Sequence, residues 1–219
     1  MIEAVVFDMD GVIVDSEQVW DDVRERYTRE VGGTYTATAT RDMMGMSSVE
    51  WSRYMHDALG VPGTPEEINA EVVRRMLEQY GEAPPLIRGA VEAVRECAAR
   101  WPLAVASSSN PELIEVVLER ADIRALFRAV VSSQEVPRGK PAPDVYLAAA
   151  QQLAVEAARC AAVEDSHNGI RSAKAARMHV VAVPNTHFPP DAESLALADV
   201  VVQSVAEVPV AIRGLNDVE

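Results

Sequence analysis

The second half of the sequence alternates short apolar segments with segments of helical character. Short apolar runs occupy residues 103–107, 129–132, 160–164, 179–184 and 199–202, and stretches of roughly ten residues with helical periodicity lie between them. Strands that alternate with helices form parallel sheets covered on both faces. Because crossovers between parallel strands are right-handed, we predict a doubly wound α/β domain.

A long helical stretch separates the first strand from this alternation. Residues 3–7 form an apolar run that fits a buried strand, whereas helical periodicity dominates from residue 17 to about residue 80. We therefore predict a Rossmann-like core domain at 1–14 and 86–219, with an inserted small α-helical cap domain at 15–85.

The composition excludes several classes of function. Apolar residues make up 48% of the 219 residues and charged residues 25%, as in ordinary globular proteins. No apolar run approaches the roughly 20 residues that cross a bilayer, and the N-terminus lacks signal-peptide features. We therefore expect a cytoplasmic protein with no membrane partner. Cys97 and Cys160 lack CxxC spacing and are expected to be core residues.

The net charge of −14 at pH 7 bears on the partners. Such a surface repels polyanions, so we expect no nucleic-acid partner. It would also repel a phosphorylated metabolite at long range, so a phosphate site here needs local positive charge from a metal ion and a lysine. The oligomeric state stays open between a monomer and a weak dimer.

Polar side chains gather where the predicted strands end. Open α/β sheets bind ligands outside the carboxyl ends of their strands, and Lys140 lies in the loop after the strand at 129–132. The residues at the other strand ends are Asp8, Asp10, Ser107, Ser108, Ser109, Asn110, Glu164 and Asp165. We therefore expect the functional site at this edge of the sheet.

Four of these residues are acidic. Asp8 and Asp10 are two positions apart, so both side chains can point into one crevice, and Glu164 and Asp165 end a second strand in the same way. Four converging carboxylates need a counter-charge, and Mg²⁺ is the cation that bridges protein carboxylates and substrate phosphate. Two plainer interpretations stay open: a solvated turn at the first pair, and a helix N-cap at Asp165.

Two further segments could bind a phosphate. Residues 107–110 end a strand just before Pro111, where hydroxyls and exposed N–H groups at a helix N-terminus can hold an anion. A plain capping segment is the alternative. Lys140 would supply the positive charge that a phosphate beside four acids requires, although a lone loop lysine is commonly solvated.

The segments that contain these residues resemble a known set of motifs. VVFDMDGVIVDS, ASSSN, GKPAPDVY and VEDSHNGIRSAKAA are similar to the four motifs of the haloacid dehalogenase-like superfamily. The branch that the sequence resembles has a small helical cap after the first strand, and it includes beta-phosphoglucomutases and many sugar-phosphate phosphatases. The resemblance covers the whole core and implies a Mg²⁺-dependent phosphatase for a small phosphorylated metabolite.

The resemblance also implies catalytic roles. Asp8 would be the nucleophile that forms an aspartyl-phosphate. Asp10 would be the general acid that protonates the leaving oxygen and later the base that activates water. Ser107 would hydrogen-bond the transferring phosphoryl group, and Lys140 would balance its charge, as phosphoryl transfer requires.

The implied metal ligands narrow the choice of activity. They are Asp8, the backbone carbonyl of Asp10, and Asp165, with Glu164 as a further ligand or as a partner of the ligands.

The family's dehalogenases lack an acid at the position of Asp10 and need no magnesium, so phosphate chemistry is favoured. A phosphonatase would need a Schiff-base lysine in the cap, and residues 17–83 contain no lysine.

The cap segment distinguishes a phosphatase from a mutase. The sequence resembles beta-phosphoglucomutases at Asp15, but these have a histidine where Trp20 stands and an arginine in the loop that is here Met43 to Ser47. We therefore favour a phosphatase, with a beta-phosphoglucomutase-type phosphomutase as the alternative. A Mg²⁺-binding regulatory module without turnover is a further alternative, although Asp8 and Asp10 are both intact.

Substrate recognition is expected to involve the cap. The predicted substrate-binding residues are Asp15, Trp20, Gly45, Ser47, Ser108 and Asn110. Candidate pocket walls, which could instead be cap core, are Trp20, Met43, Met44, Met46, Trp51 and Met55. Arg41 and Arg53 are either substrate contacts or surface charges. The identity of the substrate stays open.

Overall fold

The computed structural model describes residues 1–43, 46–185 and 189–216. Within them, six strands form one parallel sheet in the order β3-β2-β1-β4-β5-β6. The strands are β1 Ala4–Phe7, β2 Leu103–Ser107, β3 Phe127–Ser132, β4 Cys160–Glu164, β5 His179–Ala182 and β6 Val200–Val201. The chain builds outward from β1 in both directions, so the predicted doubly wound α/β fold is confirmed, with its switch point between β1 and β4.

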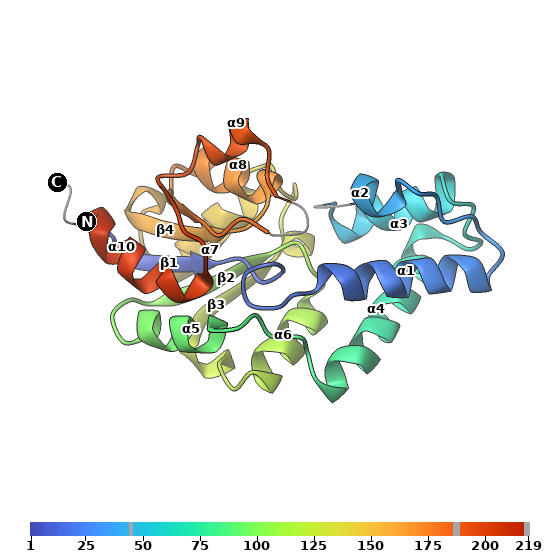
Figure 1. Ribbon diagram of the computed structural model, residues 1–219, viewed down its shortest axis with the longest axis horizontal. Helices are drawn as coiled ribbons and strands as arrows, with labels where there is room; N and C mark the ends of the chain where they lie inside the picture. The colour runs from blue at the N-terminus through green and yellow to red at the C-terminus, as the bar shows by residue number, and fades with distance from the viewer. Residues whose placement is uncertain (44–45, 186–188, 217–219) are drawn as a thin grey trace.

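Helices surround this sheet and extend beyond it. The α-helices are α1 Glu17–Glu30, α2 Ala39–Met43, α3 Ser48–Asp57, α4 Pro65–Glu82, α5 Ala90–Ala98, α6 Pro111–Arg120, α7 Asp144–Leu153, α8 His167–Ala175, α9 Ala192–Leu195 and α10 Val208–Asn216. The inserted helices (α1–α4) come between β1 and β2 in sequence and lie together beside one end of the sheet (Figure 1). The domain boundaries at residues 15 and 85 stay a prediction.

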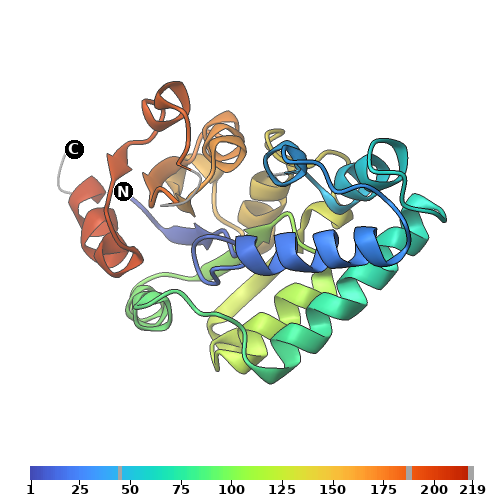
Figure 2. The ribbon, with the colours of Figure 1, turned by 45° about the vertical axis from the view of Figure 1, so that its right-hand side comes forward.

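The two faces of the sheet pack against different helices. Along β1, Val5 and Phe7 belong to a hydrophobic cluster with α5, α6 and α10, whereas Ala4 and Val6 belong to a cluster with α7 and α8. Side chains alternate along a strand, so these two sets lie on opposite faces. In Figure 2, α5 and α6 lie below the strands and α8 lies above them. Burial on both faces explains why the strands are apolar runs.

The inserted helices are attached by the same packing. Trp51, Met76 and Tyr80 belong to the cluster that covers the α5–α6 face of the sheet. Helix α4 begins at a capping box, in which the Glu67 side chain accepts from the Thr64 N–H at 2.8 Å and the Thr64 hydroxyl accepts from the Glu67 N–H at 3.2 Å. Such a cap satisfies two N–H groups that the helix leaves unpaired.

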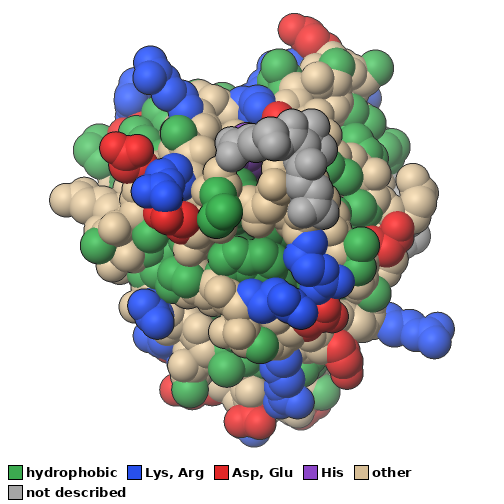
Figure 3. Space-filling model, turned by 90° about the vertical axis from the view of Figure 1, so that its left-hand side faces the viewer, with side chains coloured by type: hydrophobic (Ala, Val, Ile, Leu, Met, Phe, Trp, Pro, Cys, Tyr) green, Lys and Arg blue, Asp and Glu red, His purple; other side chains and the backbone are tan. Residues whose placement is uncertain are grey.

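The described part of the chain contains no helix long and apolar enough to cross a membrane. On the face shown in Figure 3, which carries the N-terminal end of the sheet and α10, basic and acidic side chains are interspersed with hydrophobic ones. The excess of acidic residues is therefore not concentrated on this face.

Candidate active site

The candidate site lies at the carboxyl ends of β1, β2 and β4. Asp8 directly follows β1, and its N–H donates to the carbonyl of Val163 in β4 at 3.0 Å. Gly11 then turns the chain with a φ of +76°, and a Cβ at this position would lie 1.8 Å from Oδ2 of Asp165. Both the backbone conformation and the lack of space therefore require glycine here.

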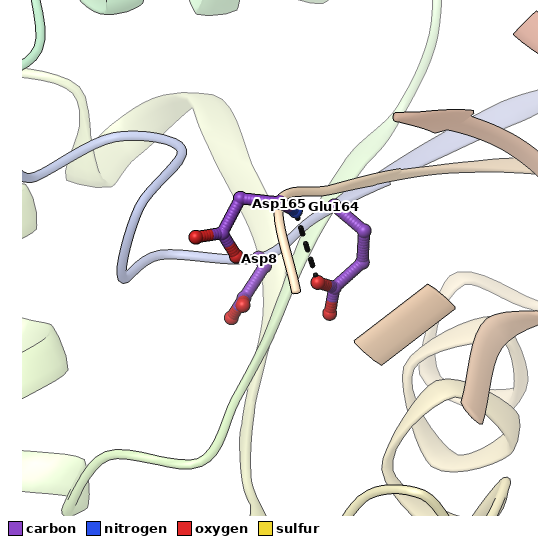
Figure 4. Close-up of side chains that lie close together, drawn as sticks. All are labelled: Asp8, Glu164 and Asp165. Atoms are coloured by element: carbon purple, nitrogen blue, oxygen red, sulfur yellow. Dashed lines mark hydrogen bonds between the residues drawn. The ribbon is translucent and has the colours of Figure 1, made fainter. Parts of the chain in front are cut away.

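Asp8, Glu164 and Asp165 converge at these strand ends (Figure 4). One carboxylate oxygen from each lies within 4.8 Å of the others, and all three residues are buried. Burial raises the pKa of Asp8 and of Asp165 well above the ordinary value, and the charge of Glu164 raises both further. Two acids whose ionisation burial opposes, together with a third acid beside them and only oxygen ligands on offer, are a donor set that a hard cation completes. The cluster therefore fits Mg²⁺.

Glu164 is held by donors on both of its oxygens. Its Oε1 accepts from Nζ of Lys140 and from the Tyr146 hydroxyl, each at 2.7 Å. Its Oε2 accepts from the N–H of Asp165 at 3.1 Å, drawn as a dashed line in Figure 4, and from the Ser166 hydroxyl at 3.1 Å. Burial opposes ionisation, but Lys140 and these donors hold the pKa of Glu164 below its ordinary value.

The start of α8 brings its backbone against Glu164. The N-cap is Ser166, whose hydroxyl accepts from the Gly169 N–H at 3.1 Å. The alternative interpretation of Asp165 as the helix cap was therefore wrong. A Cβ at Gly169 would lie 1.8 Å from Oε1 of Glu164, so this glycine provides the space that the carboxylate occupies.

Lys140 lies between two of the acids. Its Nζ is 3.0 Å from Oδ1 of Asp8 and 2.7 Å from Oε1 of Glu164. Burial alone would lower the pKa of Lys140, but the charges of Asp8 and Glu164 raise it above the ordinary value. The lysine is thus a buried cation of the site, and the solvated alternative is excluded.

Asp10 is fixed from two sides. Its Oδ1 accepts from the Ser16 hydroxyl at 2.5 Å and from the Trp20 indole N–H at 3.4 Å. Its Oδ2 accepts from the Ser109 hydroxyl at 2.8 Å and from the Ser107 hydroxyl at 3.4 Å. The carboxylate therefore connects the segment entering α1 with the end of β2.

A pocket of about 130 Å³ opens above these groups. Asp8, Asp10, Lys140 and Asp165 line one part of it. One face of α1 lines another, with residues at helical spacings of three and four: Glu17, Trp20, Asp21 and Arg24. The acidic residues of the core and a polar and aromatic face of α1 therefore line the same pocket.

Several predicted residues lie at this pocket. Those that line it are Trp20, Met43, Met46, Trp51 and Ser108. Ser107 is fully buried and reaches the site through Asp10 and through the Ser109 N–H, which donates to its hydroxyl at 3.0 Å.

Other predicted residues lie elsewhere. Asn110 is buried and its amide lies 3.4 Å from Oδ1 of Asn69, whereas Asp15 is exposed and Ser47 pairs with Glu50 at the start of α3. Met55 is fully buried in the helix core, and Arg41 and Arg53 are exposed, which is the surface-charge alternative. Met44 and Gly45 lie outside the described residues.

Some pocket residues were not predicted. They are Ser16, Glu17, Asp21, Arg24, Thr40, Ser166, His167 and Asn168. Helical spacing from Trp20 is the signal that identifies three of them, because residues 17, 21 and 24 fall on the same side of α1 as Trp20.

Comparison with known proteins places the chain in a family. The model of the haloacid dehalogenase-like hydrolases matches residues 2–177. The chain is a haloacid dehalogenase-like hydrolase. This hydrolase is 34% identical over 225 residues to hexitol phosphatase B of Escherichia coli K12, an alignment that covers 94% of each chain. It is 31% identical over 178 residues to the phosphorylated carbohydrates phosphatase of Thermotoga maritima, which covers 80% of this hydrolase and 82% of the relative.

A solved structure shares the hydrolase fold and both of its parts. CbbY of Rhodobacter sphaeroides, solved in complex with phosphate, superimposes with a TM-score of 0.84 at 26% identity, covering 95% of this hydrolase and 96% of CbbY. The coverage includes the inserted helices as well as the sheet.

Proposed function

We propose that this hydrolase releases phosphate from a small phosphorylated sugar or polyol, with Mg²⁺ as cofactor, through an aspartyl-phosphate on Asp8. The observation that carries the proposal is the convergence of Asp8, Asp165 and Lys140 in a pocket that Asp10 also lines. Two relatives support the substrate class, since their names give hexitols and phosphorylated carbohydrates as substrates.

Asp8 is the proposed nucleophile. Its Oδ1 accepts from the Met9 N–H at 2.7 Å and faces Lys140 at 3.0 Å, which leaves the other oxygen to attack phosphorus. Attack forms a bond from this oxygen to phosphorus and breaks the bond from phosphorus to the ester oxygen. Water then attacks the aspartyl-phosphate, releases inorganic phosphate and regenerates the carboxylate.

Asp10 is the proposed general acid and base. It gives a proton to the departing ester oxygen and later takes a proton from the attacking water. Its hydrogen bonds to Ser16 and Ser109 hold the carboxyl group in the pocket beside Asp8. Positioning of this kind is a large part of catalysis in phosphoryl transfer.

Charge balance is assigned to Lys140 and to the metal. Lys140 stabilises negative charge on the transferring oxygens and on Asp8. Asp8, Asp165 and the Asp10 carbonyl, with Glu164 beside them, would hold Mg²⁺, which would supply further positive charge to the same oxygens. Ser108, which lines the pocket, is an additional donor for the phosphoryl group.

A phosphatase is favoured over a phosphomutase. A mutase must hold two phosphates at once, and the end of the pocket formed by α1 contains Glu17 and Asp21 beside Arg24. Two carboxylates near the cation disfavour a second dianion there.

Phosphate release from a panel of esters tests the proposal. The panel is sorbitol 6-phosphate, glucose 6-phosphate, glycerol 3-phosphate, and beta-glucose 1-phosphate with its bisphosphate activator, each with Mg²⁺ and with a chelator. We expect Mg²⁺-dependent release that Asp8→Asn abolishes while the circular dichroism spectrum is retained. Isomerisation of beta-glucose 1-phosphate with little free phosphate would identify a mutase, and turnover by the Asp8→Asn variant would refute the covalent intermediate.

A further inference from the structure

Arg24 is a pocket residue whose guanidinium is held by aromatic rings. It lies 4.6 Å from the ring centre of Trp20 and 4.8 Å from that of Trp51. The two indoles are themselves in contact, with ring centres 5.9 Å apart. Stacking on two aromatic faces fixes a guanidinium in one orientation, so the donors of Arg24 are pre-positioned at the pocket.

Two polar atoms of this helix face have no hydrogen-bond partner. Within the described residues, Nε of Arg24 and Oε2 of Glu17 are buried atoms with no hydrogen-bond partner, although Asn185 also interacts with the Glu17 carboxyl group. Both side chains line the pocket. A buried donor or acceptor without a partner costs stability. One atom is a donor and the other an acceptor, so a single type of ligand group can satisfy both.

The charge of Arg24, in contrast, is partly offset by nearby acids, because Glu17 and Asp21 line the same pocket. Burial lowers its pKa to about 10, while the negative charges of Asp21 and Asp10 oppose that shift. An added carboxylate or phosphate at this place would meet Asp21 and Glu17 as well as Arg24. The site therefore lacks hydrogen-bond partners rather than negative charge.

A hydroxyl group is the ligand that fits these conditions. One ester hydroxyl can accept from Nε of Arg24, and another can donate to the ionised Glu17 side chain or accept from its protonated form. A carboxylate on the ligand cannot donate, and it would also meet the charge of Asp21. The indoles of Trp20 and Trp51 provide apolar faces for the carbon chain that carries the hydroxyls.

We propose that Arg24 and Glu17 bind hydroxyl groups of the leaving group on the α1 side of the pocket, and that Arg24 selects uncharged polyhydroxy esters over acidic ones. This inference rests on the proposed phosphatase function and assigns the specificity of the same pocket. Arg24 is a specificity-determining residue and takes no part in the bond changes at phosphorus.

The test compares three esters and three variants. The esters are sorbitol 6-phosphate, which is long and uncharged beyond the phosphate, glycerol 3-phosphate, which is short, and 6-phosphogluconate, which is long and acidic. Arg24→Met removes the donors and keeps an apolar chain on the indoles, and Arg24→Lys keeps the charge without Nε. Arg26→Met is the matched control, because Arg26 is exposed on the same helix.

We expect Arg24→Met and Arg24→Lys to lower kcat/KM for sorbitol 6-phosphate roughly 10- to 100-fold, as when a buried polar partner of a substrate hydroxyl is lost. The change for glycerol 3-phosphate should stay within about 3-fold, and Arg26→Met should change neither. The wild type should prefer the polyol ester to 6-phosphogluconate.

Three outcomes would overturn the inference. Full activity of Arg24→Lys on sorbitol 6-phosphate would show that charge alone matters, and a wild-type preference for 6-phosphogluconate would make the site acid-specific. An equal loss on the long and short esters would make Arg24 structural. In each case continued Mg²⁺-dependent release from glycerol 3-phosphate would leave the phosphatase proposal intact, whereas absence of turnover on every ester would refute both.

Discussion

The ammonium of Lys140 lies 3.0 Å from Oδ1 of Asp8, with only 3% and 8% of the two side chains exposed. Glu164 lies on the other side of the ammonium at 2.7 Å. Solvent and salt screen charges at this depth weakly. One lysine therefore pairs with two acids in the free protein, and we expect the stability of the core to depend on it.

We expect Lys140→Met to lower the free energy of unfolding by about 3–5 kcal/mol, because it leaves two buried carboxylates without their cation. Urea unfolding in Mg²⁺-free buffer measures the change. The control is Arg138→Met, since Arg138 pairs with Asp144 at 2.9 Å in the same loop but is 69% exposed and should matter little. Equal unfolding midpoints for the two variants would contradict the assigned charge balance.

Mg²⁺ should stabilise the protein against heat. Binding at roughly 100 times Kd contributes about 2.7 kcal/mol, which corresponds to a rise in Tm of roughly 5–10 °C for a chain of this size. Differential scanning calorimetry with MgCl₂, against NaCl at matched ionic strength, measures the shift. Asp165→Asn should abolish the shift without lowering the Tm of the metal-free protein, and an undiminished shift would place the ion elsewhere.

Gly169→Ala should damage the site although alanine favours helices. Its Cβ would lie 1.8 Å from Oε1 of Glu164, so the carboxylate and the lysine it holds must move. We expect a loss of about 1–3 kcal/mol in stability, together with a fall in phosphate release. Gly81→Ala in α4 meets nothing within 4 Å and should stabilise by up to about 1 kcal/mol. Similar effects of the two substitutions would disprove the contact.

Glu17 should give stability a pH dependence. Burial, with the charges of Asp15 and Asp10, raises its pKa from 4.5 to about 7. The folded protein therefore holds a proton between these values that the unfolded chain releases, so the contribution of Glu17 to stability is greatest below about pH 4.5 and declines as the pH rises to 7. Relative to Glu17→Gln, the wild type should lose stability between pH 5 and pH 8 in Mg²⁺-free urea titrations. A constant difference between the two proteins would argue against the raised pKa.

The core of the fold could be predicted because its signals are local. Strands β1, β2 and β4 are apolar runs that are buried throughout. A polar residue stands at or just after the end of each, as with Asp8 and Glu164, and marks the edge of the sheet where the candidate site lies. The predicted ends of the last two strands differ from the observed ones. The run at 179–184 becomes β5 His179–Ala182 and the run at 199–202 becomes the two-residue edge strand β6, because β6 has a neighbour on one side only.

The substrate-facing side of the pocket could not be predicted in the same way. Helical periodicity shows that residues 17, 20, 21 and 24 share a face, but not whether that face meets solvent, the helix core or a pocket. That depends on how α1 approaches the sheet. The sequence therefore placed Arg24 on the same side of the helix as Trp20 but could not show that this side meets a pocket, which follows from the packing of Arg24 against Trp20 and Trp51.

The helix residues that face the leaving group in the proposed complex come from one uninterrupted stretch, from Glu17 to Trp51, whereas the groups around phosphorus are scattered from Asp8 to Asp165. Substitutions are therefore expected to affect the two sets of residues differently during evolution. A few substitutions within this one short segment could therefore change the substrate of such a protein, whereas the scattered set must be preserved together for any turnover. Related hydrolases are therefore expected to differ in substrate more readily than in the reaction that they catalyse.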